Sequence, residues 1–175
     1  PSGMKAMGDY LHARGFKFGI YADGGVRTCG NMPGSYGYER QDARQFADWG
    51  VDLLKYDFCH TAAGCRGENQ FRRMGQALRE TGRDIIYSAS WSLGDVWKWM
   101  RSCGAHMWRL TGDIQDSWKS IEACGFGAVG LEAYAGPCGW NDMDMLVTGL
   151  DGKGWVGGIG GGSRDNEYQT HFALW

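Results

Sequence analysis

Two stretches decide the fold: FKFGIYAD at residues 16–23 and VDLLKYD at residues 51–57. Each is a short β-prone run that ends in an aspartate. Three similar runs follow at residues 84–90, 106–110 and 139–145. Segments with helical spacing of apolar residues lie between them. The runs start at residues 16, 51, 84, 106 and 139, which is the spacing of consecutive βα units, so the sequence predicts a parallel sheet.

Glycines mark where the intervening helices end, because a helix commonly closes on a left-handed residue. The apolar positions and their closing glycines are Met4, Met7 and Leu11 before Gly15, Phe46 and Trp49 before Gly50, Phe71, Met74 and Leu78 before Gly82, and Val96 and Met100 before Gly104. Tyr168, Phe172 and Trp175 predict a final helix.

Five βα units fit either a complete doubly wound sheet or part of an eight-stranded (β/α)8 barrel, which needs about 250 residues. Carboxylates at the carboxyl ends of four strands favour the barrel, since those ends converge on one mouth where chemistry is done. They are Asp23, Asp57, Asp113, and Asp142 with Asp144. The predicted fold class is therefore α/β, a partial TIM barrel, with the five-stranded flavodoxin-like domain as the rival.

Composition narrows the function. The 175 residues contain 18 Lys and Arg against 20 Asp and Glu, a net charge of −2, which argues against a partner bound through nucleic-acid phosphates. No apolar run approaches the roughly 20 residues that span a bilayer, so no membrane partner is expected. Thirty Gly and nine Trp suggest a loop-rich binding cleft with aromatic platforms. The chain opens at Pro1, and we expect a fragment of a longer protein.

No cofactor or metal is predicted. The six cysteines match no zinc or CxxC spacing, and the four histidines, His12, His60, His106 and His171, show no HExxH or triad spacing. His12 and His171 fall in predicted helices, as surface or packing residues. GKGWVG at residues 152–157 matches GxGxxG, but a glycine-rich loop follows it where a dinucleotide site needs a helix.

The acidic residues carry the candidate chemistry. Strand alternation turns Lys55 and Asp57 to the same side, and a cation keeps a neighbouring carboxylate ionised, as a nucleophile requires. The alternative is a structural salt bridge at a strand end. Asp116 suits the cap of a following helix, which leaves Asp113 for the mouth.

Asp142 and Asp144 share a face if their run stays extended. Paired acids also occur in calcium loops, but the further ligands and the closing Glu of an EF-hand are missing here. Two aspartates on different strand ends, among Trp and Tyr, are what glycoside hydrolysis requires. A sugar-binding module without catalysis is the alternative from another class.

Several longer motifs carry a resemblance. GIYADGG (19–25), PGSYGYERQDARQFADWGVDLLKYDFC (33–59), WRLTGDIQDSW (108–118), GPCGWNDMDML (136–146) and EYQTHFALW (167–175) resemble, in this order, the melibiase-type retaining α-galactosidases of glycoside hydrolase family 27. The match runs from about residue 2 to the end of the chain. It implies that the five strands are the third to seventh of the barrel.

The resemblance also implies roles. Asp57 would be the nucleophile and Asp113 the acid/base, acting on a terminal α-linked galactose by double displacement. Cys29 and Cys59 would form a disulfide at the mouth, with Cys29 bordering the sugar, which implies an extracytoplasmic location, secreted, periplasmic or lysosome-like. The residues that would hold the sugar and its leaving side are Tyr21, Lys55, Arg109 and Asp144.

Departures from the family pattern fall at the position that recognises the sugar 2-substituent. The family's YSCEW reads YSASW at residues 87–91, so Ser90 replaces a Glu and Ala89 stands where the family often has a Cys. Ser90 favours an α-N-acetylgalactosaminidase, whereas Leu93, three residues on, favours an α-galactosidase. Loss of a hydrogen-bonding Glu is expected to relax discrimination there.

The domain expectation is that residues 1–175 form a fragment of a glycosidase catalytic barrel. The first two strands, the eighth strand and the C-terminal β-domain of the family are absent from the sequence. We therefore expect the 175-residue chain alone to be inactive and the activity to belong to its full-length parent. The sequence gives no expectation for the oligomeric state.

Overall fold

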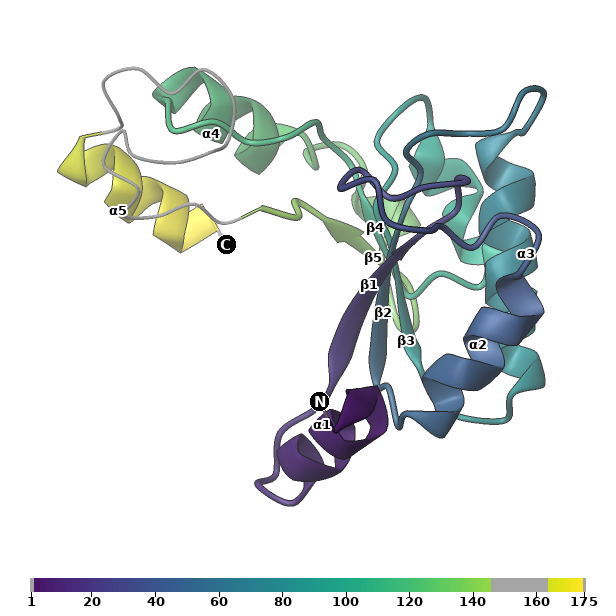
Figure 1. Ribbon diagram of the computed structural model, residues 1–175. Helices are drawn as coiled ribbons and strands as arrows, with labels where there is room; N and C mark the ends of the chain where they lie inside the picture. Colours follow the sequence, from purple (N-terminus) through teal and green to yellow (C-terminus); the bar gives the residue numbers. More distant parts are fainter. Residues whose placement is uncertain (1, 146–163, 175) are drawn as a thin grey trace.

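The computed structural model describes residues 2–145 and 164–174 (Figure 1). All five predicted strands form, each shorter than predicted, and α-helices connect most of them. The strands are β1 (Gly19–Asp23), β2 (Leu53–Asp57), β3 (Ile86–Ala89), β4 (Met107–Arg109) and β5 (Trp140–Asp142), and the helices are α1 (Gly3–His12), α2 (Glu39–Asp48), α3 (Gly67–Glu80), α4 (Trp118–Phe126) and α5 (Asp165–Leu174). No helix among the described residues has the length and apolarity needed to cross a membrane.

The strand order settles the choice between the two predicted architectures. All neighbouring strands are parallel, and they follow one another as β1-β2-β3-β4-β5. A doubly wound sheet reverses its strand order at a switch point, whereas a βα barrel keeps adding strands in sequence. The sheet is thus a portion of a barrel wall, and the flavodoxin-like alternative is wrong.

The register arranges the side chains of one sheet face in layers. In-register partners point to the same face, and moving two residues along a strand reaches the next layer. From the amino end to the carboxyl end, the layers are Gly19, Leu53 and Ile86, then Tyr21, Lys55, Ser88, Met107 and Trp140, then Asp23 beside Asp57 and Arg109 beside Asp142. Polarity therefore rises along this face and culminates in charged side chains at the carboxyl ends of the strands.

The opposite sheet face supplies the hydrophobic core. Leu54, Tyr56, Tyr87 and Trp108 alternate with the layered residues and are buried, at most 1% exposed. Figure 1 shows α2 and α3 side by side along this part of the sheet. Phe71 of α3 makes an edge-on ring contact with Tyr56 at 5.7 Å between centroids. The core anchors the strands from the face opposite to the charged layer.

The helix ends confirm the glycine rule but not every predicted helix. Gly15, Gly50, Gly82 and Gly104 all have positive φ, between 73° and 88°. The helix expected over Val96 and Met100 is wrong: the segment forms two short 3₁₀ turns, η1 (Val96–Lys98) and η2 (Met100–Cys103). Glycines with positive φ at positions 94 and 104 bound this segment on both sides.

The cap predicted for α4 is also wrong by one residue. Ser117 occupies the N-cap and its side chain accepts a hydrogen bond from the Ser120 backbone N–H. Asp116 instead accepts a hydrogen bond of 2.6 Å from the Tyr168 hydroxyl, which connects this segment to α5. The predicted GxGxxG match at residues 152–157, and Trp175 of the final helix, lie outside the described residues.

The amino ends of the strands are held by a different polar cluster. Asp52, just before β2, accepts the Phe18 backbone N–H at 2.7 Å and contacts His12 Nε2 at 2.7 Å. Arg83 donates to Asp52 at 3.0 Å and also to the carbonyls of Gly50 and Val51. His12 lies in α1 and packs here, as predicted. This cluster fixes the starts of β1 and β2 relative to α1.

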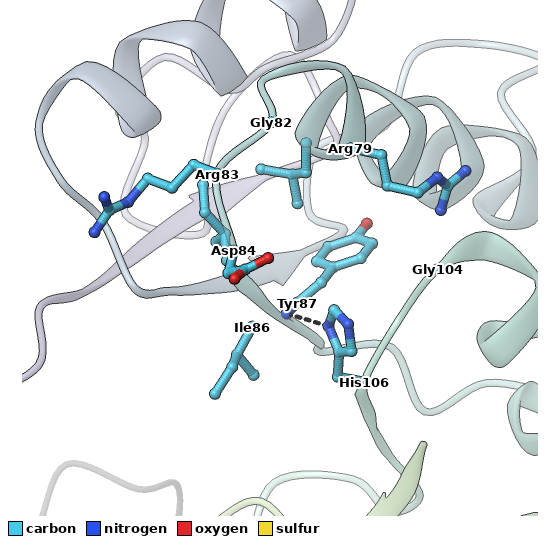
Figure 2. A pocket seen from close by; sticks show the side chains of 11 residues that line it. Arg79, Gly82, Arg83, Asp84, Ile86, Tyr87, Gly104 and His106 are labelled. Carbon is cyan, nitrogen blue, oxygen red and sulfur yellow. Dashed lines mark hydrogen bonds between the residues drawn. The ribbon is translucent and has the colours of Figure 1, made fainter. Parts of the chain in front are cut away.

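A cavity of about 450 Å³ lies at the same end, beside β3 (Figure 2). The Tyr87 backbone N–H donates to His106 Nδ1 at 2.9 Å, which leaves the imidazole proton on Nε2. Figure 2 shows the Arg83 guanidinium directed away from Tyr87 and His106, and this group donates to the Gly50 and Val51 carbonyls. The cavity is thus at the opposite end of the strands from the aspartates that the sequence predicts for chemistry.

Candidate active site

The carboxyl ends of the strands bring together a cluster that we call the carboxylate rim, made of Asp23, Asp57, Arg109, Asp142 and Asp144. β1 and β2 are five-residue strands that both end in Asp, and their register pairs Asp23 with Asp57. Arg109 is likewise paired with Asp142. The rim therefore follows from where aspartates stand at the strand ends.

Asp57 is held by neutral donors. Its Oδ2 accepts the Tyr21 hydroxyl at 2.8 Å, and its Oδ1 accepts the Phe58 backbone N–H at 2.9 Å. Cys29 Sγ lies 3.7 Å from Oδ2. Among the described residues, no Lys, Arg or His forms an ion pair with this carboxylate. Asp57 is oriented from two sides and keeps its negative charge uncompensated.

Tyr21 stays protonated beside Asp57. Burial, the hydrogen bond to Asp57 and the negative charge of Asp57 together raise the pKa of Tyr21 far above its usual value. The side chain is nevertheless 46% exposed, so one part of the ring contacts solvent while the hydroxyl binds the carboxylate. Tyr21 can thus donate a hydrogen bond to Asp57 throughout the physiological pH range.

Lys55 departs from the expectation of a partner within its own strand. It lies on the rim side of β2, but its ammonium pairs with Asp144, 89 residues further along the chain. Arg109 Nη1 approaches the other oxygen of Asp144 at 3.0 Å. The Asp144 side chain is only 5% exposed. One buried carboxylate therefore holds two cations at the centre of the rim, and the predicted Lys55–Asp57 pair does not form.

Asp113 is the most accessible acid of the site. Its side chain is 73% exposed, and Arg109 Nη2 contacts Oδ1 at 2.5 Å. Arg109 Nε also donates to the Thr111 carbonyl at 2.6 Å, which fixes the turn between Arg109 and Asp113. Arg109 thereby links the accessible Asp113 to the buried Asp144.

Asp142 and Asp144 are expected to share a face only if their segment stays extended. The segment that follows β5 does not stay extended. Asp144 has a φ of 70°, and its backbone N–H donates to Asp142 Oδ1 at 2.8 Å. This turn directs Asp144 toward Lys55 and Arg109. Burial and the nearby Asp144 raise the pKa of Asp142.

Asp23 is a component of the site to which sequence reasoning gave no role. Its side chain is fully buried and binds the backbone N–H groups of Gly25 and Cys59. Burial raises the pKa of Asp23, although these two N–H groups oppose the shift. Aligning the ends of GIYAD and LLKYD would have placed Asp23 beside Asp57, but nothing local in the sequence shows its burial.

The disulfide implied by the resemblance forms. Cys29 and Cys59 are bonded, with their Cα atoms 5.3 Å apart. Asp23 and Asp57 lie with them in one group whose candidate ligand atoms are within 4.8 Å of one another. Bonded sulfurs are not thiolate ligands, and the Asp23 oxygens already accept two backbone N–H groups, so this cluster does not fit a metal in its oxidised state. Cys65, Cys103, Cys124 and Cys138 are free.

Ser90 and Leu93 differ in environment. Ser90 is 4% exposed, and its hydroxyl has no hydrogen-bond partner among the residues described. Leu93 is 68% exposed on the loop after β3. The Trp91 indole, between them, packs on Phe58 at 4.7 Å and donates to the Leu93 carbonyl at 3.1 Å. The loop is therefore tied to the residue that follows Asp57.

Comparison with known proteins places the chain in a family. A family model described as Alpha galactosidase A matches residues 1–175. The chain belongs to this family. It is 44% identical to an alpha-galactosidase of Cyamopsis tetragonoloba over 177 residues, which covers 100% of the chain and 40% of that protein.

Solved structures show the same fold. Alpha-galactosidase I from Mortierella vinacea superposes with a TM-score of 0.87 at 32% identity, covering 100% of this chain and 48% of that one. The alfa-galactosidase of Saccharomyces cerevisiae, solved with raffinose, gives 0.81 at 29% identity, covering 100% and 42%. The chain thus spans less than half the length of these family members. The expectations of an α-galactosidase family and of a partial barrel are confirmed.

Proposed function

We propose that the protein carrying this chain is a retaining glycosidase that releases terminal α-linked galactose by double displacement. The observation that carries the proposal is the contrast between Asp57, oriented by neutral donors and free of any ion pair among the described residues, and Asp113, exposed and in contact with Arg109. One carboxylate is placed to attack and the other to exchange protons with the leaving group and with water.

In the first step, an Asp57 oxygen attacks the anomeric carbon while the bond from that carbon to the leaving oxygen breaks. Asp113 gives its proton to that leaving oxygen. Asp113 then takes a proton from water, and the resulting hydroxide displaces Asp57 from the sugar. Tyr21 holds the Asp57 carboxylate in position, and no step requires a metal or cofactor.

The cations bind the sugar. Asp144 pairs with both Lys55 and Arg109 and fixes their positions, which leaves the remaining N–H groups of both side chains to donate to hydroxyls. Cys29, beside Asp57, borders the ring. The solved relative with raffinose supports a galactoside as substrate, and the disulfide supports an extracytoplasmic location. Residues 1–175 form part of the catalytic barrel.

The test uses the longest natural protein that contains residues 1–175. Its hydrolysis of nitrophenyl α-galactoside is followed by NMR, and a retaining enzyme releases the α anomer of galactose first. Initial release of the β anomer contradicts double displacement. If the protein binds the galactoside but does not hydrolyse it, it is a sugar-binding module and not an enzyme.

A parallel assay on nitrophenyl α-N-acetylgalactosaminide tests the second candidate activity. Ser90, small and with an unbonded hydroxyl, favours room for an acetamido group, whereas Leu93 favours galactose. We expect the galactoside to be the better substrate because Leu93 retains bulk near this position. A higher kcat/KM for the acetamido sugar would replace the proposed substrate.

A further inference from the structure

The fully buried carboxylate of Asp23 lies beside Asp57 but belongs to none of the chemical steps. Oδ1 accepts the Gly25 N–H at 2.7 Å, and both oxygens lie 3.0 Å from the Cys59 N. Gly25 belongs to the loop after β1 and Cys59 to the loop after β2. One side chain therefore joins the two loops that flank Asp57.

The junction of these loops is unusually close. The Gly24 N–H donates to the Asp57 carbonyl at 2.8 Å, and the Val26 N–H donates to the His60 carbonyl at 3.1 Å. A Cβ on Gly25 would lie 1.7 Å from the Cys59 carbonyl oxygen, so only glycine fits. The Cys29–Cys59 disulfide closes the same junction from the solvent side. Small shifts of the Cys59 backbone would therefore move Asp57, two residues earlier.

We propose that Asp23 is a positioning residue for Asp57, because it holds the Gly25 and Cys59 backbone N–H groups and thereby sets the place of the Asp57 carboxylate. This inference rests on the proposed function. Burying a carboxylate next to a second carboxylate costs electrostatic free energy. Packing alone would not require a charged residue at this position. Its two acceptor oxygens, rather than its charge, explain its presence.

Substitutions separate the hydrogen bonds from the charge. In Asp23→Asn, the amide oxygen can replace Oδ1 and accept both N–H groups, while the charge is removed. Asp23→Ala removes both acceptors and leaves two buried donors unpaired. Asp23→Ser keeps one short oxygen and supplies a milder variant should the alanine variant not fold. Asp42→Asn is the control, because Asp42 is a partly buried carboxylate that also has a raised pKa, while both N–H groups bind Asp23.

The measurement is covalent trapping of the longest natural protein by an activated 2-deoxy-2,2-difluoro-α-galactoside with a trinitrophenyl leaving group. The Asp57 oxygen forms an ester to the anomeric carbon, and the phenolate departs without needing a proton, so the rate does not depend on Asp113. Peptide mass spectrometry identifies the labelled residue. Thermal melting and the mass of the intact disulfide check the fold of each variant.

We expect wild type, Asp42→Asn and Asp23→Asn to trap Asp57 at rates within about threefold of one another. Asp23→Ala should trap it at least about 30-fold more slowly, with little change in the initial binding constant, since a displacement of about 1 Å costs on the order of 100-fold. Asp23→Ser should fall between them.

Two results would overturn the inference: Asp23→Ala or Asp23→Ser trapping Asp57 at the wild-type rate, or Asp23→Asn falling as far as the alanine variant, which would assign the effect to charge. Labelling of a residue other than Asp57 in wild type would instead contradict the proposed function. The two failures are thus distinguishable.

Discussion

Asp52 and Asp57 stand at opposite ends of the same strand and show how similar groups acquire different uses. Asp52 is surrounded by cations and further polar groups: Arg83 and Lys17 form ion pairs with it, and the His12 ring and the Phe18 N–H contact it. Among the described residues, Asp57 accepts hydrogen bonds from a phenol and a backbone N–H, and Lys55, which could have paired with it, pairs with Asp144. A carboxylate saturated by cations stabilises the fold, whereas one held by neutral donors keeps its charge for a substrate.

The two ends also differ in what surrounds them. The cluster at the amino ends joins α1 and the starts of the strands, where alternative loops would disturb the core. The carboxylate rim lies at the carboxyl ends of the strands, next to loops that can change without disturbing the barrel wall. The comparison predicts that substitutions of Asp57 alter the rate with little loss of stability, and that substitutions of Asp52 do the reverse.

The largest effect is expected for Asp57→Asn in the longest natural protein. The amide cannot displace the leaving group, so kcat should fall by at least about 10⁴-fold, while substrate binding and melting temperature change little. Steady-state kinetics, isothermal titration with galactose and thermal melting provide the three readouts. A variant that retains more than about a tenth of wild-type kcat would remove Asp57 from the chemistry.

Asp113→Ala should produce a smaller loss that depends on the leaving group. General acid catalysis contributes about 10²- to 10⁴-fold, and a dinitrophenyl leaving group needs little protonation. We expect a loss of about 10³-fold on a disaccharide such as melibiose and a much smaller loss in formation of the covalent intermediate from dinitrophenyl α-galactoside. Equal losses on both substrates would mean that Asp113 does not donate the proton.

Part of the fold and of the site can be predicted from local sequence. The five strands follow from β-prone runs, their spacing and the glycines that end the helices between them, because strand propensity and helix ends are local properties. The strand-end aspartates, including Asp57, follow from the same pattern, since parallel strands bring their carboxyl ends together.

The rest depends on contacts between distant parts of the chain. Lys55 meets Asp144 only because β2 and the turn after β5 lie on one face, and that turn needs the positive φ of Asp144. Alternation along β2 alone suggested Asp57 as the partner. The position of Asp116 just before a helical segment predicts a helix cap. Its contact with Tyr168, 52 residues further along the chain, depends on the tertiary fold and cannot be read from spacing.

At the other end of β2, Asp52→Ala should lower the free energy of unfolding by about 2 kcal/mol near neutral pH, with kcat almost unchanged. The Asp52 side chain is only 14% exposed, and its removal leaves several hydrogen-bond donors unpaired. Urea unfolding of the longest natural protein measures the first quantity. Asp57→Asn is the matched control, because it should lower kcat and leave the free energy of unfolding almost unchanged.

The contribution of Asp52 should also depend on pH. Burial alone would raise the pKa of Asp52, but the Phe18 N–H, His12 and Lys17 outweigh it and lower the pKa below the unfolded value of about 3.9. The stabilisation is therefore present above about pH 4 and is lost as the pH falls through the folded pKa. The stability difference between wild type and Asp52→Ala should shrink in that acidic range. A difference that grows there would contradict this assignment.

The smallest expected effect tests whether the rim extends into the loop after β3. Trp91→Phe preserves the ring contact with Phe58 but removes the indole N–H that donates to the Leu93 carbonyl. One hydrogen bond contributes about 1 kcal/mol, so the ratio of kcat/KM for the galactoside over the N-acetylgalactosaminide should fall by up to about fivefold. The ratio should fall, and not rise, because a less restrained Leu93 side chain leaves more room for the acetamido group. Leu93→Ala should shift the ratio further in the same direction, and an unchanged ratio in both variants would place substrate discrimination outside this loop.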